Sequence, residues 1–214
     1  MTDATSKRLS RPGPAEAGRD AVLEAAAEEF VKHGFTATSM DGIADALGST
    51  KGRVYHYYRG KAEIFLDVVL HGMHDLLLMI EPIATESGVP ARERLSRMVR
   101  SHALCMMEAS NPQRVAVQLV QYRGMPELAT HTETTERIIE LRRRYERAFR
   151  DVVSEGIADG AFLDVDPSLA AKSMLGSLNW IPMWFRPGRG ADEVARIADF
   201  FSETALRSLE AEGA

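Results

Sequence analysis

The chain has 214 residues, is 45% hydrophobic and 27% charged, and carries a formal net charge of -5. These values are typical of a globular protein of one or two domains and exclude a largely disordered chain. Its single cysteine, Cys105, excludes an intrachain disulfide and fits a cytoplasmic protein, and no apolar run approaches the roughly 20 residues that span a bilayer.

Residues 1–18 combine Ser, Thr, Pro and Gly with little apolar content, which predicts a disordered arm. The cations of this arm and Arg19 are candidates for reaching a DNA groove, with a solvated tail as the equal alternative. From Arg19 onward an apolar stripe at helical spacing predicts a first helix, which Gly34 ends as a C-cap. The stripe consists of Val22, Leu23, Ala26, Ala27 and Phe30.

Two short helices joined by a tight turn are predicted next. Ser39 is expected to cap a helix from Met40 to Leu47. Residues 48–50 break that helix, and Thr50 is expected to cap another from Lys51 to Tyr58. Two helices separated by a short turn that contains Gly form the helix-turn-helix pattern.

The second of these helices lies in a basic and aromatic stretch. Residues 51–61 hold four Lys/Arg, three Tyr and one His but no acid, whereas residues 1–60 carry eight Lys/Arg and eight Asp/Glu. The positive charge is therefore local, which indicates a recognition helix that meets DNA rather than a strongly basic domain. Val54 and Tyr58 are four residues apart and are expected to face inward. The alternative is a solvated helix face.

The remaining residues also show helical periodicity, and no convincing strand is found, so the predicted fold class is all-α with about nine helices. Further helices are predicted from Lys61 to about Ile80, closed by Pro82, and then over 90–108, 112–122, after Pro126 to about 159, 168–185 and 191–210.

The last two predicted helices, about 168–185 and 191–210, suggest a self-association surface. Lys172 is the only charged residue in the first of them, and a helix almost without charge must be buried. The second is apolar on more than one face. Two such helices, doubled by a two-fold axis, would form a four-helix homodimer interface.

Residues 19–65 carry aromatic, small and basic residues at fixed spacing, namely Phe30, Gly34, Phe35, Ser39, Ile43, Ala44, Gly48, Gly52, Tyr55, Tyr58 and Lys61. With these residues the segment resembles the DNA-binding domain of the TetR family of transcriptional repressors. It departs from the family pattern at Leu47, Ser49 and Gly60. The resemblance implies a helix-turn-helix domain over 19–62, after the arm of 1–18, and a helical ligand-binding and dimerisation domain over 63–214.

This resemblance also implies a homodimer that binds double-stranded, palindromic operator DNA. Ser39, Thr50, Tyr55 and Lys61 are expected to contact phosphates. Base edges are expected to meet Arg53 and His56, with Lys51 and Tyr57 nearby and Gly52 allowing close approach. Phosphate contacts position such a helix, whereas base contacts select the sequence.

A ligand pocket is predicted where soft and aromatic side chains converge with a few polar ones. The candidates are Met106, Met107, Tyr122, Arg123, Tyr145, Phe149, Asn179, Trp180, Met183 and Trp184. Ordinary core packing is the alternative for these residues. The segment 178–188 resembles TetR-type regulators of fatty-acid and sterol catabolism that respond to acyl-CoA thioesters, which suggests a small apolar effector such as an acyl-CoA.

Two other functional classes stay open. One is a DNA-binding regulator that has no small-molecule ligand and answers to a protein partner. The other is an all-helical enzyme, although the sequence has no nucleophile elbow, phosphate-binding loop or dinucleotide fingerprint. No cofactor, metal site, catalytic residue or membrane partner is expected, and His102 on an apolar face suggests a satisfied core residue or a polar group of the pocket.

Overall fold

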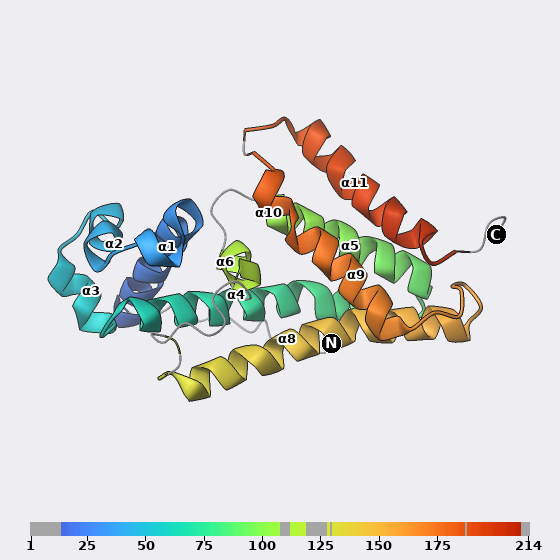
Figure 1. Ribbon diagram of the computed structural model, residues 1–214, viewed down its shortest axis with the longest axis horizontal. Coiled ribbons are helices and arrows are strands. Elements are labelled where there is room, and N and C mark those ends of the chain that lie inside the picture. The colour runs from blue at the N-terminus through green and yellow to red at the C-terminus, as the bar shows by residue number, and fades with distance from the viewer. Residues whose placement is uncertain (1–13, 108–111, 119–127, 129, 187, 211–214) are drawn as a thin grey trace, which may run out of the picture.

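The computed structural model describes residues 14–107, 112–118, 128, 130–186 and 188–210. Every element within these ranges is an α-helix, which confirms the predicted all-α class. Figure 1 shows the three N-terminal helices grouped at one end of the molecule. The long helices α4 (Lys61–Ala84) and α8 (Thr132–Ala158) run side by side away from them and carry the remaining helices.

Helix α1 (Pro14–Ala37) begins before the predicted start at Arg19. Proline suits the first helical position, and Ala and Glu are strong helix formers, so residues 14–18 extend the helix into the predicted arm. The rest of that arm lies outside the described residues. Gly34 breaks the helix as predicted, because its φ of 73° lies in the left-handed region that glycine adopts without strain.

Helices α2 (Met40–Ala46) and α3 (Lys51–Tyr57) form the predicted helix-turn-helix. The hydroxyl oxygen of Ser39 accepts a hydrogen bond from the Gly42 amide at 3.0 Å, which caps α2. Gly48 makes the turn with a φ of 62°. Thr50 stands at the N-cap position of α3, but its side chain makes no capping hydrogen bond.

Helix α4 runs to Ala84 rather than ending before Pro82 as predicted. A proline inside a helix removes the hydrogen bond to the carbonyl four residues earlier, which here belongs to Leu78. Because Leu78 is 61% exposed, water can reach this carbonyl, and the last turn continues at low cost.

Helices α5 (Ala91–Met107) and α6 (Pro112–Gln118) pack against α4 from the other side. Their apolar faces join those of α4 and α8 in one continuous hydrophobic core. Cys105 lies in this core, as expected for a small buried hydrophobe.

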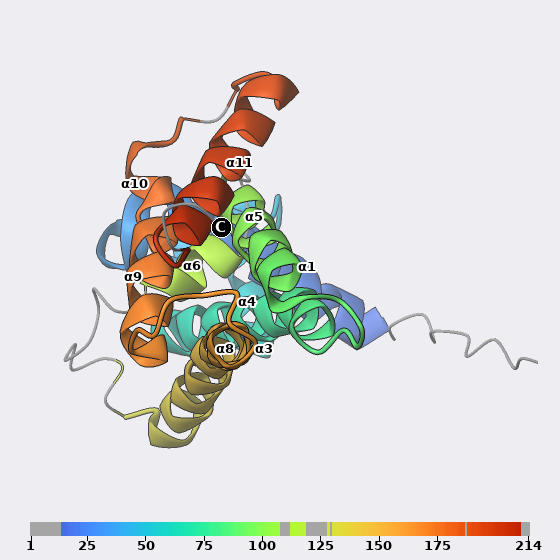
Figure 2. The same ribbon diagram turned by 90° about the vertical axis from the view of Figure 1, so that its right-hand side faces the viewer.

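The predicted helix over 168–185 is two helices, α9 (Pro167–Asn179) and α10 (Ile181–Trp184). Pro182 cannot donate to the Leu178 carbonyl, so the chain breaks at Trp180 and restarts with Pro182 in the first turn of α10. Helix α11 (Ala191–Arg207) then packs along α5, as Figure 2 shows from the side. None of the described helices is both long and apolar enough to cross a membrane.

Candidate nucleic-acid interface and ligand cavity

The recognition surface is the exposed face of α3. Val54 is fully buried and Tyr58, just after the helix, is 2% exposed, so both side chains face inward as predicted. These two contacts turn the opposite face outward. The exposed residues of this face are Lys51, Gly52, Arg53, Tyr55 and His56, together with Ser39 and Thr50 at the helix starts. This is a set of hydrogen-bond donors on one helix end, which suits phosphate and base contacts.

Three of the side chains predicted to contact DNA also make contacts within the protein. The Lys51 ammonium pairs with the Asp41 carboxylate at 2.9 Å. Lys61 donates to the Thr36 carbonyl at 3.1 Å, with its ammonium 4.6 Å from the centre of the Phe35 ring. Tyr57 is half-buried beside Gly18 of α1, where any added Cβ would lie 2.2 Å from its hydroxyl oxygen. Lys51 and Lys61 are thus oriented by contacts within the protein, and Tyr57 packs against α1.

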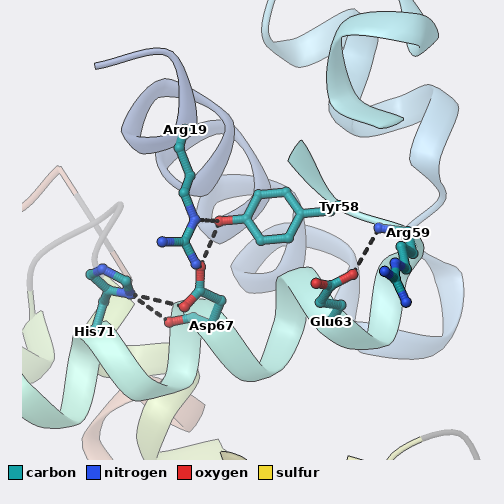
Figure 3. Close-up of polar contacts among 6 residues, drawn as sticks. All are labelled: Arg19, Tyr58, Arg59, Glu63, Asp67 and His71. Atoms are coloured by element: carbon teal, nitrogen blue, oxygen red, sulfur yellow. Dashed lines mark hydrogen bonds and ion pairs between the residues drawn. The ribbon is translucent and has the colours of Figure 1, made fainter. Parts of the chain in front are cut away.

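A cluster of Arg19, Tyr58, Asp67 and His71, here called the Asp67 cluster, ties the recognition helix to the rest of the molecule (Figure 3). The Tyr58 hydroxyl donates to Asp67 Oδ2 at 2.5 Å. Arg19 Nη2 donates to the same oxygen at 2.7 Å, and Arg19 Nε donates to the Tyr58 hydroxyl at 3.1 Å. One carboxylate of α4 therefore fixes both α1 and the chain directly after α3.

His71 completes the Asp67 cluster from the next turn of α4. Its Nδ1 lies 2.8 Å from the Asp67 carbonyl oxygen and 3.5 Å from Asp67 Oδ1. Burial alone would raise the pKa of Asp67, but the hydrogen bonds of His71 and Tyr58 and the charge of Arg19 outweigh it and lower this pKa. The hydrogen bond to Asp67 raises the pKa of His71.

The Asp67 cluster is not predicted from the sequence, in which Arg19 is a candidate for reaching a DNA groove. The signal that could have revealed it is a lone acid within the apolar run 64–69. A carboxylate at such a position must find partners when the helix is buried.

The C-terminal helices form a cavity of about 280 Å³ that is partly open to solvent. Its walls come from α4, α5, α6, α8 and α9. The apolar lining residues are Met73, Leu76, Ala116, Val117, Leu175 and Gly176, and the polar ones are His102, Arg142, Tyr145, Glu146, Lys172 and Asn179. An apolar space with a few polar groups on its wall is the usual composition of a small-molecule site.

A buried hydrogen-bond chain forms one wall of this cavity. His102 is 1% exposed, and its Nδ1 lies 2.6 Å from the Tyr145 hydroxyl while its Nε2 lies 3.0 Å from Asn179 Oδ1. Burial lowers the pKa of His102 to about 4, so the ring is neutral near pH 7. Burial also raises the pKa of Tyr145, which keeps its proton.

The predicted pocket residues are divided between three places. Tyr145 and Asn179 line the cavity. Met106, Met107 and Phe149 are buried in the core beside it. Trp180, Met183 and Trp184 do not line it but lie on the surface, 59%, 47% and 40% exposed. Tyr122 and Arg123 lie outside the described residues.

Further large apolar side chains are exposed on the last helices. Leu169 of α9 and Phe200 of α11 are both 64% exposed, and Trp180 follows α9 directly. Several exposed large apolar side chains are often found where a protein contacts another protein.

Both halves of the chain match known families. Residues 22–68 match the family described as bacterial regulatory proteins, tetR family. Residues 88–209 match the family described as tetracyclin repressor-like, C-terminal domain. The first match covers the helix-turn-helix, and the second covers helices α9 to α11 and all of the cavity lining except Met73 and Leu76.

Similar proteins extend over almost the whole chain. The HTH-type transcriptional repressor KstR2 of Rhodococcus jostii is 30% identical over 89% of this chain and 90% of its own length. The crystal structure of the TetR family regulator PfmR from Thermus thermophilus covers 90% of this chain and 97% of its own, with 32% identity and a TM-score of 0.73. The structure of AibR in complex with isovaleryl coenzyme A and operator DNA covers 87% of this chain and 97% of its own, with 26% identity and a TM-score of 0.73.

Proposed function

The chain belongs to the TetR family of bacterial regulatory proteins, and from this we propose that it is a repressor that binds palindromic operator DNA as a homodimer. We further propose that a small apolar effector of the acyl-CoA class enters the cavity and releases the DNA. The observation that carries the proposal is the donor-rich, exposed face of α3, held outward by Val54 and Tyr58.

The DNA contacts follow from where each side chain lies. The hydroxyls of Ser39, Thr50 and Tyr55 and the ammonium of Lys61 are proposed to meet phosphates on either side of the major groove. Arg53 lies in the first turn of α3 and His56 in its last turn, and both are proposed to meet base edges. Lys51 and Tyr57 are proposed to support this contact, and Gly52 lets the backbone approach the DNA.

Dimerisation is proposed through α9 and α11, the helices expected from the sequence. One seven-residue helix offers few base contacts, so two recognition helices on a two-fold axis are needed for a specific site. The exposed Leu169, Trp180 and Phe200 support this interface, because burying large apolar side chains is the main driving force of association.

The effector class is supported by the cavity and by AibR, which was crystallised with isovaleryl coenzyme A and operator DNA. Helix α4 offers a route from the cavity to the DNA, since Met73 and Leu76 line the cavity and Asp67 lies earlier on the same helix. For release, the effector must bind the form that cannot hold DNA more tightly than the form that can.

Replacing Arg53 with alanine is expected to change which operator sequences are bound. The loss of one base contact should lower the binding free energy for the best operator sequence by about 1–3 kcal/mol. The loss should be much smaller for operators that already carry another base pair at the contacted position. Tyr55→Phe should instead weaken all sequences alike, because it removes a phosphate contact. Fluorescence anisotropy with a panel of single-base operator variants measures both. An equal loss on every sequence for Arg53→Ala would rule out its contact with bases.

A further inference from the structure

With the oxygen of the Asn179 amide facing His102, as in this structure, the hydrogen-bond chain behind the cavity has one arrangement of protons. Neutral His102 has a single N–H. Asn179 Oδ1 can only accept, so the proton of His102 lies on Nε2, which donates to it over 3.0 Å. His102 Nδ1 is then an acceptor and receives the Tyr145 hydroxyl proton over 2.6 Å.

This arrangement fixes the amide of Asn179 at the cavity wall. Its oxygen is occupied by His102, so its NH₂ group is the part left to face a ligand. Among the described residues this NH₂ group makes no hydrogen bond to the protein. A donor beside an apolar space recognises an acceptor such as a carbonyl oxygen, since an apolar ligand alone would leave it unsatisfied.

The size of the cavity limits the apolar part of that ligand. At roughly 30 Å³ for each non-hydrogen atom, the share of a water molecule in the liquid, 280 Å³ holds about nine atoms. A short or medium acyl chain fits wholly within this space, whereas a steroid nucleus or a long fatty chain would extend beyond it.

The lining of the cavity includes an exposed cation. The Lys172 side chain is 57% exposed, and its ammonium lies 3.4 Å from a carboxylate oxygen of Glu146. An exposed ammonium at this place can attract a phosphate-bearing carrier such as coenzyme A.

We propose that the effector is an acyl thioester with a chain of up to about eight carbons, set by the cavity volume, whose carbonyl oxygen accepts a hydrogen bond from the Asn179 amide. The chain lies against Met73, Leu76 and Leu175. His102 and Tyr145 do not need to touch the effector; they are positioning residues that hold the Asn179 amide in place. This inference rests on the proposed function and narrows its effector to one size class.

The chain-length limit is tested by isothermal titration calorimetry of the full protein with acetyl-, octanoyl- and palmitoyl-CoA. Octanoyl-CoA is expected to bind at least about tenfold more tightly than acetyl-CoA, because each buried methylene adds favourable transfer free energy. It should also bind at least about tenfold more tightly than palmitoyl-CoA, whose chain exceeds the cavity. Palmitoyl-CoA binding as tightly as octanoyl-CoA would overturn the size limit.

The carbonyl contact is tested from both sides. S-octyl-CoA, a thioether without the carbonyl oxygen, is expected to bind about tenfold more weakly than octanoyl-CoA to the unchanged protein. Asn179→Asp keeps an oxygen that accepts from His102 but replaces the NH₂ donor with a second oxygen. The affinity of this variant for octanoyl-CoA should be about tenfold lower, and its affinity for S-octyl-CoA should change little. Ser154→Asp adds the same charge at an exposed site of α8 and should bind octanoyl-CoA like the unchanged protein.

Equal binding of the thioester and the thioether by the unchanged protein would overturn the role of Asn179, even if Asn179→Asp failed to fold. Displacement of DNA by palmitoyl-CoA alone would overturn the size limit but leave the proposed repressor with an acyl-CoA effector. If the protein bound operator DNA and none of the three thioesters bound to it, the acyl-CoA effector of the proposed function would itself be wrong.

Discussion

Asp67→Asn is expected to weaken operator binding by at least about tenfold and to lower the free energy of unfolding by about 2 kcal/mol. The amide has the shape of the carboxylate but not its charge, so the oxygen that accepts from both Tyr58 and Arg19 becomes a weaker acceptor, and an NH₂ group replaces the oxygen that faces His71. Breaking a buried ion pair can cost more, but Arg19 is half exposed and its charge is screened by water. Urea unfolding and fluorescence anisotropy with operator DNA measure the two effects.

Two control variants separate the effect of the hydrogen bonds in the Asp67 cluster from the effect of removing one negative charge. Tyr58→Phe removes only one hydroxyl of the Asp67 cluster and should give a smaller loss, about 1 kcal/mol. Asp164→Asn removes the same charge at an exposed site and should leave both quantities unchanged. If Asp67→Asn bound operator DNA as tightly as Asp164→Asn, the Asp67 cluster would not position the recognition helix.

The acid dependence of stability provides an independent readout of Asp67. Its pKa is lower in the folded chain than the ordinary value near 3.8, so the unfolded chain binds more protons as the solution becomes acidic. The stabilisation from Asp67 is therefore complete above the ordinary pKa and is lost as the pH falls through the folded pKa. Asp67→Asn should make the free energy of unfolding fall less steeply below about pH 4.

Gly72→Ala is expected to lower the free energy of unfolding by about 2–3 kcal/mol. A Cβ at this position would lie 2.5 Å from the Pro112 carbonyl oxygen and 2.7 Å from its carbon. These are backbone atoms of α6, so the clash can be relieved only if α4 and α6 move apart. Chemical denaturation measures the loss, and Gly42→Ala, which meets only ordinary contacts at 3.4 Å, is the control.

The same substitution should weaken octanoyl-CoA binding, because α4 and α6 both contribute to the cavity wall. Met73 follows Gly72 directly, and Ala116 lies one turn after Pro112. Calorimetry with octanoyl-CoA is expected to show at least about tenfold weaker binding in Gly72→Ala. Unchanged stability and binding would show that α6 is not held against α4 at this point.

The helix-turn-helix could be predicted because its determinants are local. The Ser39 cap, the left-handed Gly48 and the inward pair Val54 and Tyr58 act within a few residues of one another. Each belongs to a pattern with a known spacing, so the sequence alone specifies the motif and the exposed face of α3.

The partners of Arg19 and His102 could not be predicted, since they lie far away along the chain. Arg19 meets an acid 48 residues later, and His102 meets groups 43 and 77 residues later. Periodicity identifies which face of a helix is buried but not which polar groups meet there. Of the aromatic residues expected at the pocket, Tyr145 lines the cavity, whereas Trp180 lies exposed on the surface because Pro182 breaks the helix.

The most direct test of a ligand-responsive repressor is operator binding with and without octanoyl-CoA. DNA selected from random duplexes by the full protein is expected to be palindromic, and its binding in fluorescence anisotropy should weaken as salt rises. Octanoyl-CoA should then release it, whereas coenzyme A alone should not. Selection of no sequence over random DNA, or an anisotropy that octanoyl-CoA and other acyl thioesters leave unchanged, would contradict the account.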